Sequence, residues 1–496
     1  MIIFPTVGSI KKALKDGFLS QEVYDNTYNI LMSKNMEDAV FMGQFIKKNL
    51  IDNLSANLND EQKRILSNML EYIYSPMDEN LKACLLNGSA GTGKTTTMAK
   101  IIYAVTILSP EDEVNVNAPT HKAIKVLAEK CSNINNNGQV TFNTTHSSLG
   151  LRATYTSDGR LKFTRASKEP STYRLMIVDE TSMLEDEIAK IIMDSKNFKN
   201  TKIIFMGDIK QLPPVNSKES FIFSNTERLK IYQMNLTKIV RQVADNPIVK
   251  FTKFLGDNIG NIKHLKFQQE VTKDGDGIIL RGIDQLDNII KYWYSLEETR
   301  KNPDNLRILA WTNRMVNKCN VMCRNLLFNN PKDKFVPGER IVVREQIVKN
   351  GKTIAENSDE LVVSNCKVVK IKKKIPFTKD YVPFEFYAIQ TNELKDMLYV
   401  ITKESRELYE KKLDDVKQFC IRKSDPKKWI EYYEMRGWSS NINYAYANTI
   451  HTSQGSTYQN ALVIMSDVEN NNNFIERNKL CYTAFTRAKK KLIILL

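Results

Sequence analysis

The first residues whose types and spacing could bind a ligand form the stretch Gly-Ser-Ala-Gly-Thr-Gly-Lys-Thr, which begins at Gly88. Glycines at this spacing let backbone N–H groups close around a phosphate, and the helix expected after them adds partial positive charge at its first turn. Lys94 is placed to reach the β- and γ-phosphates, and the Thr95 hydroxyl suits Mg²⁺. The pattern predicts ATP binding, with nucleotide contacts from Gly88, Gly91, Thr92, Gly93, Lys94, Thr95 and Thr96.

Two carboxylates follow the apolar run Leu175–Val178. A strand with that sequence delivers Asp179 and Glu180 side by side at its carboxyl end. After a phosphate-binding loop, such a pair supplies a ligand for Mg²⁺ and a base for water. We therefore expect Asp179 to hold the metal through water and Glu180 to polarise the attacking water.

A polar loop follows the next apolar run and contains Gln211. Gln211 is a candidate sensor of the γ-phosphate, and the two prolines after Leu212 stiffen the loop. The alternative is a proline turn with a solvent-facing glutamine side chain.

A parallel sheet is needed to bring these groups together. From residue 81 onward, short apolar runs alternate with helical patterns, which is typical of a parallel α/β sheet. The strands expected in a first unit are Ala83–Leu86, Val114–Ala118, Leu175–Val178 and Ile203–Met206. Those expected in a second unit are Arg307–Trp311, Ala461–Met465 and Lys491–Leu495. The predicted fold class is α/β, with two α/β units in one chain.

Two hairpins and a β-rich segment interrupt this pattern. Asp158-Gly159 and Asn350-Gly351 favour tight hairpin turns, because their residues tolerate positive φ. Residues 340–400 are rich in Val, Ile, Phe and Tyr and contain the basic run Lys370–Lys374, and residues 403–437 are helical in pattern. We expect a small β domain with helices inserted in the second unit.

Composition and charge exclude several classes of protein. The 496 residues are 42% hydrophobic and 26% charged, as in a soluble globular protein, and no apolar run approaches the ~20 residues that span a bilayer. Seven scattered cysteines fit a reducing cytosol, so we expect a cytoplasmic protein without membrane association. The net charge of +15 favours a polyanionic partner such as nucleic acid, although a solvated basic surface without a partner is equally compatible with it.

In their order along the chain, these motifs resemble those of superfamily-one helicases, and in particular the RecD/Dda-like branch. The resemblance covers about residues 56–496, and its collinear order is more specific than any single motif. It implies two RecA-like parallel-sheet lobes, a β-hairpin in the first and a small β-barrel with helices in the second. It also implies ATP and Mg²⁺ as cofactors and single-stranded DNA as the track.

The resemblance adds site residues by position. Gln62 matches the adenine-reading glutamine before the phosphate-binding loop, with helix capping of Asn59 as the alternative, and Gly455 lies in a further nucleotide motif. The segments that match strand-lining motifs contribute Pro119, Thr120, His121, Lys122, Thr144, His146, Thr312, Asn313, His451 and Thr452. A histidine there donates to phosphate or stacks on a base, and a metal site is the rival interpretation.

Arg241 and Arg487 match the two arginines that reach the γ-phosphate. Hydrolysis needs positive charge opposite the metal, and such arginines accelerate it by about 10³–10⁵. Both lie far from Lys94 in sequence, so closure of two lobes must bring them in; a surface salt bridge is the alternative for each. The predicted catalytic set is Lys94, Glu180, Gln211, Arg241 and Arg487.

Two insertions have roles implied by the same resemblance. The hairpin at Asp158-Gly159 occupies the position of a strand-separating pin, in which Phe163 or Tyr155 stacks on the last base pair; an ordinary surface hairpin is the alternative. The basic β insertion resembles a barrel that steadies the strand, with Lys370–Lys374 at backbone phosphate, and a solvated lysine face is its alternative.

The predicted organisation has four parts. Residues 1–55 form a helical accessory segment without a chemical motif. Residues 56–240 form the first lobe, with its hairpin at about 151–170. Residues 241–339 and 445–496 together form the second lobe, and residues 340–444 form the inserted domain.

The predicted function is an ATP-dependent helicase that translocates 5′→3′ on single-stranded DNA and unwinds duplex, in phage replication, recombination or repair. The expected partners are single-stranded and forked DNA and a single-strand-binding or replisome protein, and the expected state is a monomer. The alternatives are a RecD-like motor subunit of a larger complex, an ATP-switched clamp, and RNA as the track.

Overall fold

The computed structural model describes residues 7–17, 19–33, 48, 50–131, 138–165, 173–194, 198, 200–214, 217–240, 246–302, 304–349 and 352–496. The chain divides into two compact units. The first unit is Met1–Gly150 with Ser167–Ala244, and the second is Leu151–Ala166 with Asp245–Leu496. Among the described helices, none combines the length and apolar composition that crossing a membrane requires.

The first unit is built on a six-stranded sheet in which every strand pair is parallel. Parallel neighbours need crossover connections, and most of the connections here contain a helix. In sheet order the strands are β3 (Val140–Thr144), β2 (Val114–Ala118), β6 (Leu175–Val178), β7 (Lys202–Gly207), β1 (Ala83–Gly88) and β8 (Ile231–Leu236).

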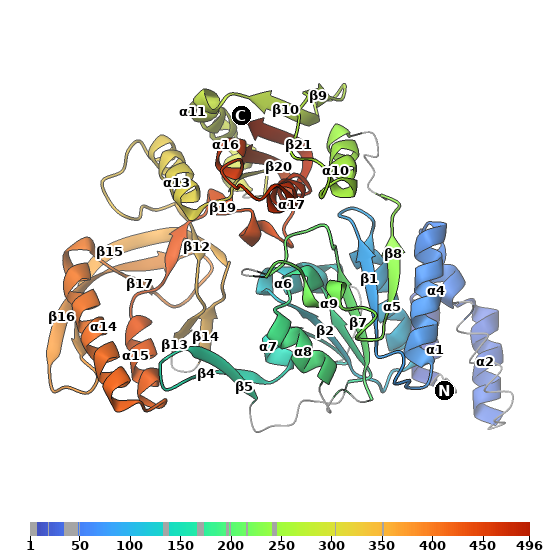
Figure 1. Cartoon of the computed structure of the whole chain (residues 1–496). Helices are drawn as coiled ribbons and strands as arrows, with labels where there is room; N and C mark the ends of the chain where they lie inside the picture. Colours follow the sequence, from blue (N-terminus) through green and yellow to red (C-terminus); the bar gives the residue numbers. More distant parts are fainter. Residues whose placement is uncertain are drawn as a thin grey trace. The chain divides into compact units, whose positions relative to one another are not determined.

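The core of the first unit lies between this sheet and a layer of helices, seen at the right of Figure 1 as α4, α5 and α1. The covering helices are α1 (Val7–Lys15), α4 (Asp60–Tyr74), α5 (Lys94–Leu108) and α6 (His121–Lys130). Buried apolar side chains such as Met69 and Ile101 meet Cys84 and Ile204 of the strands. On the other face lie the short helices α7 (Thr145–Ser148) and α9 (Phe221–Ser224) together with α8 (Asp186–Asp194). The helix α2 (Gln21–Ser33) follows α1.

The second unit contains a six-stranded sheet that is parallel except for its last pair. In sheet order the strands are β19 (Ala447–Thr449), β11 (Leu306–Ala310), β20 (Tyr458–Ile464), β21 (Ala488–Leu495), β10 (Gly277–Arg281) and β9 (Glu270–Val271). The helices of this lobe are α10 (Pro247–Asp257), α11 (Leu286–Ser295), α12 (Glu297–Lys301), α13 (Asn313–Leu327), α16 (Met465–Val468) and α17 (Phe474–Phe485). The two sheets confirm the α/β fold class with two RecA-like lobes.

The insertion in the second unit is an antiparallel five-stranded sheet. In sheet order its strands are β17 (Leu398–Ile401), β16 (Tyr381–Thr391), β15 (Glu360–Lys374), β12 (Arg340–Val343) and β18 (Ile442–Tyr444), and the hairpin β13 (Ile347–Lys349)–β14 (Lys352–Ala355) lies beside it. The helices α14 (Lys403–Lys423) and α15 (Lys428–Arg436) cover one face of β15 and β16 (Figure 1).

Two ion pairs with buried arginines hold the insertion and the residue just before it to the lobe that carries them. Arg307 on β11 contacts Glu360 at 2.8 Å, and Arg324 on α13 pairs with Glu339. A charge buried in this way is costly unless its partner stays in place. The insertion is therefore held firmly to its own lobe.

The hairpin of β4 (Leu151–Tyr155) and β5 (Leu161–Arg165) forms at the predicted turn. Gly159 has a φ of +81°, which few side chains other than hydrogen permit. The hairpin leaves the first unit after Gly150, yet it clusters with the second unit. The structural reason is its contact with α15, described below.

Candidate functional site

Three loops that were predicted to handle the nucleotide share one edge of the first sheet. They follow β1, β7 and β6, which are neighbours in that order. Because the strands are parallel, their carboxyl ends meet at the same edge, where ligands of open α/β sheets bind. This places the phosphate-binding loop, the Gln211 loop and the Asp179–Glu180 pair side by side.

The phosphate-binding loop requires its glycines. Gly91 and Gly93 both have a φ of +85°, in the left-handed region. A Cβ atom on Gly93 would lie 2.3 Å from Gln62 Nε2, and one on Gly88 would lie 2.8 Å from Thr92 Oγ1. The loop is thus packed so closely that these positions leave no room for a side chain, as expected for a loop whose backbone N–H groups surround a phosphate.

Gln62 holds this loop from α4. Its Oε1 accepts from the Asn59 N–H at 3.1 Å, and Asn59 Oδ1 accepts from the Gln62 N–H at 3.0 Å, which completes the capping box. Its Nε2 donates to the Thr92 carbonyl at 3.1 Å. The capping interpretation is confirmed, and adenine recognition by Gln62 stays a prediction.

Lys94 is the first residue of α5, and its ammonium group turns back onto the loop. Nζ donates to the carbonyl oxygens of Gly88 and Ser89. A nucleotide phosphate is a stronger acceptor than a carbonyl, so these bonds are exchangeable for phosphate contacts. The loop carbonyls therefore hold the Lys94 ammonium group at the position where the phosphates are expected.

Asp179 and Glu180 place two carboxyl groups next to each other at the end of β6. Burial, followed by the adjacent Glu180 carboxylate, raises the pKa of Asp179 to about 7, and the Lys94 ammonium opposes this rise. Glu180 has a φ of +49°, which is strained for a residue with a side chain. A divalent cation beside this pair would relieve the like-charge repulsion.

Gln211 is 4% exposed, which removes the solvent-facing alternative. Its backbone N–H donates to the Asp208 carbonyl at 3.1 Å, and its Oε1 is buried without a hydrogen-bond partner. A buried amide oxygen without a partner needs a ligand or water to satisfy it. Its position supports the prediction that Gln211 faces the reacting end of a nucleotide.

The residues present fit ATP with Mg²⁺. The glycine cradle suits phosphates, and the Thr95 hydroxyl with the Asp179 carboxylate are the oxygen ligands that Mg²⁺ prefers. In the part of the chain that the structure describes, no three His, Cys, Asp or Glu side chains gather as a further metal site. The rival interpretation of the histidines as metal ligands gains no support.

The strand-lining residues of the first unit lie at the same sheet edge. Thr120 follows β2 and caps α6 by accepting from the Ala123 N–H, with Pro119, His121 and Lys122 beside it. Thr144 ends β3 and caps α7. Since β6 is the neighbour of β2, the nucleotide and strand-lining segments are only one strand apart.

Buried polar groups support these strand-lining segments. Asn117 on β2 accepts from the Ser148 hydroxyl of α7, and its Nδ2 has no partner. Burial lowers the pKa of His146, with the Glu185 carboxylate opposing the change. His146 is therefore neutral at pH 7. Sequence inspection missed Asn117, although an asparagine inside an apolar strand was a signal.

In the second unit, Asp467 fixes the segment that contains Thr312. The carboxylate accepts from the Trp311 N–H, the Thr312 N–H and the Thr312 hydroxyl, each at 2.8 Å. Thr312 Oγ1 also caps α13 by accepting from the Met315 N–H. The Thr312 hydroxyl is thus occupied, while Asn313 starts the helix; their contact with DNA stays a prediction. No sequence motif pointed to Asp467.

His451 and Thr452 follow β19, the neighbour of β11, so they lie at the same sheet edge as Thr312. Burial lowers the pKa of His451. Thr452 Oγ1 lies 3.0 Å from Thr449 Oγ1. The strand-lining candidates of this unit are thereby brought together.

Arg487 and Gly455 lie at the opposite edge of the second sheet, before β21 and β20. All three guanidinium nitrogens of Arg487 donate within the unit: Nε to the Thr483 carbonyl at 2.9 Å, Nη1 to the Ser456 carbonyl at 2.9 Å and Nη2 to Thr486 Oγ1 at 3.0 Å. The arginine is 4% exposed, and Gly455 adjoins one of its partners. The surface salt-bridge alternative does not apply to it.

Three predicted residues lie outside what the structure describes, in whole or in their side chains. Arg241 lies outside the described residues, and so does the side chain of Phe163, as does that of Tyr155. Their predicted roles stay predictions.

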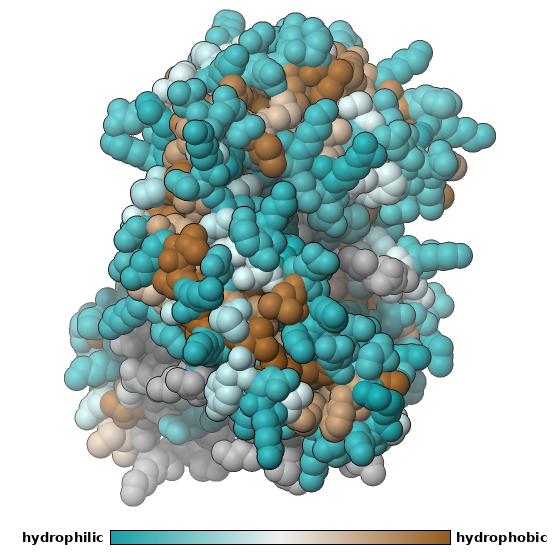
Figure 2. Space-filling model, turned by 90° about the vertical axis from the view of Figure 1, so that its left-hand side faces the viewer, coloured by the Kyte–Doolittle hydropathy of each residue, from teal (hydrophilic) through white to brown (hydrophobic). Residues whose placement is uncertain are grey.

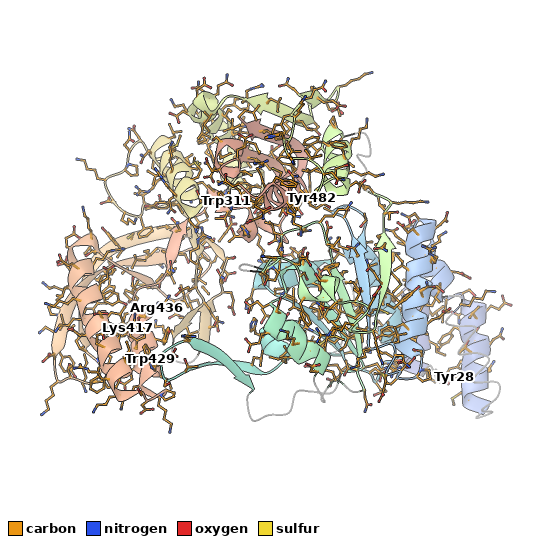
Figure 3. The ribbon with its side chains drawn as sticks, viewed as in Figure 1. Tyr28, Trp311, Lys417, Trp429, Arg436 and Tyr482 are labelled. Atoms are coloured by element: carbon orange, nitrogen blue, oxygen red, sulfur yellow. The ribbon has the colours of Figure 1, made fainter. Side chains whose placement is uncertain are left out.

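The hairpin turn is docked on α15, as the position of Trp429 in Figure 3 illustrates. Trp429 Nε1 donates to the Ser157 carbonyl at 3.2 Å, and the Tyr433 hydroxyl donates to the Gly159 carbonyl at 2.9 Å. A Cβ atom on Gly159 would lie 2.4 Å from the Trp429 ring, so the indole packs on the bare glycine. Sequence inspection found the turn but not its dock.

Comparison with known proteins extends these observations. A family model described as an AAA domain matches residues 77–217, and one described as a UvrD-like helicase C-terminal domain matches residues 444–495. The ATP-dependent DNA helicase Dda of Enterobacteria phage T4 is 26% identical over 80% of this chain and 90% of that protein. An uncharacterized protein of Acanthamoeba polyphaga mimivirus is 26% identical over 88% of this chain and 99% of its own length.

Shorter and structural matches were also found. The RecD2 DNA helicase of Deinococcus radiodurans is 30% identical over 39% of this chain and 23% of that protein. The Pif1 helicase structure from Candida albicans matches with a TM-score of 0.45 and 16% identity, over 88% of this chain and 94% of that one. By the two domain models and the helicase relatives, the chain is similar to the superfamily-one helicases of the RecD/Dda-like branch.

Proposed function

We propose that this ATP-dependent DNA helicase uses hydrolysis to move along single-stranded DNA, 5′→3′, and to separate the duplex that it meets. The observation that carries the proposal is the shared edge of the first sheet. The nucleotide loops follow β1, β7 and β6, and the strand-lining segments follow β2 and β3. A change at the γ-phosphate therefore reaches the strand-lining segments through directly hydrogen-bonded strands.

The chemistry assigned to each residue follows from its surroundings. Lys94 exchanges its carbonyl partners for the β- and γ-phosphates, and Glu180 orients the attacking water with help from Gln211 Oε1. Thr95 and Asp179 hold Mg²⁺, which supplies Lewis-acid stabilisation of the γ-phosphoryl group when bound. Arg241 and Arg487 complete the charge at the transition state.

The hairpin provides the strand-separating element in this proposal. Both of its ends are continuous with the first unit, while its turn is held by Trp429 and Tyr433 of the second. A wedge must resist the force of the duplex, and two hydrogen bonds with a packed indole give it a rigid backing. This supports the pin interpretation over an ordinary surface hairpin.

The proposal includes partners as well. The substrates are single-stranded and forked DNA, and the protein works as a monomer with a single-strand-binding or replisome protein. Neutral His146 and His451 act on DNA by stacking or hydrogen bonding, since burial lowers the pKa of each.

The deciding experiment measures unwinding of duplexes that carry either a 5′ or a 3′ single-stranded tail, with and without ATP. We expect ATP-dependent separation of the 5′-tailed substrate alone. Separation of only the 3′-tailed substrate would reverse the direction. DNA-stimulated ATP hydrolysis without separation of either substrate would leave a translocase or clamp and reject the helicase. An RNA-tailed substrate in the same assay identifies the track.

A further inference from the structure

The longest strand of the inserted domain, β15, sorts its lysines onto two faces. Successive side chains of a strand point to opposite sides. Lys370, Lys372 and Lys374 are exposed, whereas Ile371 and Lys373 between them are half-buried. What looks in the sequence like one basic run is therefore two different sets of residues.

The inner face belongs to the core of the insertion. Ile371 packs in the cluster formed with α14 and α15. The Lys373 ammonium lies 5.3 Å from the centroid of the Trp438 ring, within the range of a cation–π interaction. Lys373 is therefore committed to the fold.

The helices α14 and α15 pack against the inner face of this part of β15. The residues of β16 opposite the three exposed lysines are Glu385, Pro383 and Tyr381. Tyr381 is 66% exposed. Within the described part of the chain, none of Lys370, Lys372 and Lys374 lies within ion-pair distance of a carboxylate. We call Lys370, Lys372 and Lys374 the lysine row.

The geometry of the lysine row suits a regular polyanion. Two residues of a strand advance about 6.7 Å, so the three side chains start from points spread over about 13 Å in a nearly straight line. Each is a flexible point charge that makes no ion pair among the described residues, although Glu385 lies opposite Lys370 and Glu431 and Glu434 share the cavity that Lys374 lines. A sugar–phosphate backbone offers charges at regular intervals and releases counterions when lysines neutralise them.

The absence of stacking surfaces along the row favours duplex over single-stranded DNA. Surfaces for single strands interleave basic side chains with aromatic rings on which bases stack. Here Glu385 and Pro383 lie opposite Lys370 and Lys372, and the one exposed ring, Tyr381, stands at the end of the row. Contacts of this kind reach phosphates but not bases.

The position of the row also points to duplex. Lys374 lines a cavity of about 430 Å³ together with Glu431 and Met435 of α15. The same helix holds the hairpin turn through Trp429 and Tyr433. The row therefore ends beside the helix that holds the proposed wedge, where the proposed function would bring unopened duplex. The side of the molecule with β16 and α14 is largely hydrophilic (Figure 2).

We propose that Lys370, Lys372 and Lys374 bind the phosphate backbone of the duplex ahead of the strand-separation point. The choice of duplex rests on the proposed helicase function. The row gives the insertion a grip on DNA that is separate from the strand-lining residues of the lobes.

The test compares the triple variant Lys370→Gln, Lys372→Gln and Lys374→Gln with wild type. Binding to a blunt duplex and to a single-stranded oligonucleotide is measured without ATP over a series of salt concentrations. Each phosphate contact contributes about 0.9 to the slope of log K against log salt for duplex. We expect the duplex slope to become shallower by about 2–3, with single-strand binding and DNA-stimulated ATPase unchanged.

The matched control removes the same charge from α14, through Lys403→Gln, Lys411→Gln and Lys417→Gln. These lysines are exposed, and Lys417 is labelled in Figure 3. We expect a change in slope below about 0.5. An equal change in both triple variants would mean that net charge alone acts and would overturn the proposal. If the triple variant of the lysine row lost single-strand binding as much as duplex binding, the choice of duplex would be overturned. If its duplex slope did not change, the proposal that the row binds phosphate would be overturned as well.

A single-residue comparison removes the question of folding. Lys372→Gln should make the duplex slope shallower by about 1, while Lys373→Gln should leave it unchanged. Thermal unfolding of each variant verifies that it is folded. The ATPase and unwinding activities of wild type, measured on the same preparations, test the helicase function. Duplex binding without ATP tests the lysine row, so failure of one proposal can be distinguished from failure of the other.

Discussion

The nucleotide site and the hairpin dock are assembled in opposite ways. Lys94 meets its partners Gly88 and Ser89 within six positions of sequence. Trp429 and Tyr433 meet the hairpin turn across 272 and 274 positions. The first site is a local property of a strand, a loop and a helix, and the second exists only once the insertion has folded.

This difference concerns function as much as assembly. In the proposed function, the local site holds phosphates and carries out hydrolysis, and the remote contact supports the hairpin that separates the strands. Variants should therefore separate the two: one class stops hydrolysis, and the other leaves hydrolysis running without separation of strands.

The largest effect is expected from Lys94→Ala. Loss of the ammonium group should lower DNA-stimulated ATPase by about 10²–10³, because an electrostatic contact to the transferring phosphoryl group disappears. Unwinding should stop as well. The measurement is steady-state phosphate release at saturating single-stranded DNA.

The control for this variant is Lys63→Ala, an exposed lysine on α4. Its ATPase should equal that of wild type. Wild-type unwinding by Lys94→Ala would contradict any role of the nucleotide site in strand separation.

The second effect concerns the remote contact. Gly159→Val places a side chain against the Trp429 ring and should release the hairpin turn. We expect unwinding to fall about tenfold, since two hydrogen bonds of about 0.5–1.5 kcal/mol each are lost. The single-strand-stimulated ATPase should stay within about twofold of wild type. Stopped-flow unwinding and phosphate release on one preparation measure both.

Gly138→Val is the matched control, because Gly138 has a similar φ of +86° with nothing within 4 Å of an added Cβ. It carries the same backbone strain without the clash. If Gly159→Val lost hydrolysis and unwinding in equal proportion, the separation of the two regions would be wrong.

A third variant sharpens the comparison inside the second unit. Asp467→Ala frees the Trp311–Thr312 segment by removing three hydrogen bonds. We expect the affinity for single-stranded DNA to weaken about fivefold to tenfold, or about 1 kcal/mol. The KM for ATP without DNA should not change.

Fluorescence anisotropy with a labelled oligonucleotide measures that affinity, and the exposed Glu469→Ala nearby is the control. A parallel rise in the KM for ATP would show that Asp467 acts on the whole unit and not on this segment.

The smallest effect concerns stability and pH. The pKa of Asp179 in the folded protein, about 7, lies above its ordinary value of 3.8, so the folded state binds the extra proton between these values. Metal-free wild type should therefore lose stability as pH rises from about 4 to 7. Asp179→Asn should remove this loss and unfold at a higher temperature at pH 8, by about 1 °C per kcal/mol for a chain of this length.

Calorimetry in a chelating buffer at pH 4 and pH 8 provides the comparison. The two proteins should converge at pH 4, and Asp194→Asn, an exposed aspartate, should match wild type at both. A variant less stable than wild type at pH 8 would argue against repulsion between Asp179 and Glu180.

Sequence predicted those parts of the fold in which the signal is local. The buried central strands β1, β2, β6 and β7 are largely apolar runs, interrupted by Asn87, Asn115, Asn117 and Lys202, and they were expected at nearly their observed bounds. The edge strands β3 and β8 were not expected. Their residues alternate or are half-buried, because only one side of an edge strand meets the core.

The same limit applies to the site. The loop from Gly88 to Thr95 and the pair Asp179–Glu180 are recognisable because their chemistry is contiguous. Asp467 and Trp429 are not, because their partners are decided by which helices happen to pack together. No spacing rule connects Asp467 to Thr312 across 155 positions.

Arg487 combines a proposed catalytic role with an observed structural one, which affects how genetic variation at this position should be understood. Its guanidinium group joins the end of α17 to the segment that contains Ser456, and no other side chain offers five donors in the same plane. A lysine ammonium is a single point and does not reproduce these three contacts, which leave a planar guanidinium from three different nitrogens, even if it supplied the charge. Inactive alleles at residue 487 therefore report unfolding and lost chemistry together, and soluble yield has to be measured before either is blamed.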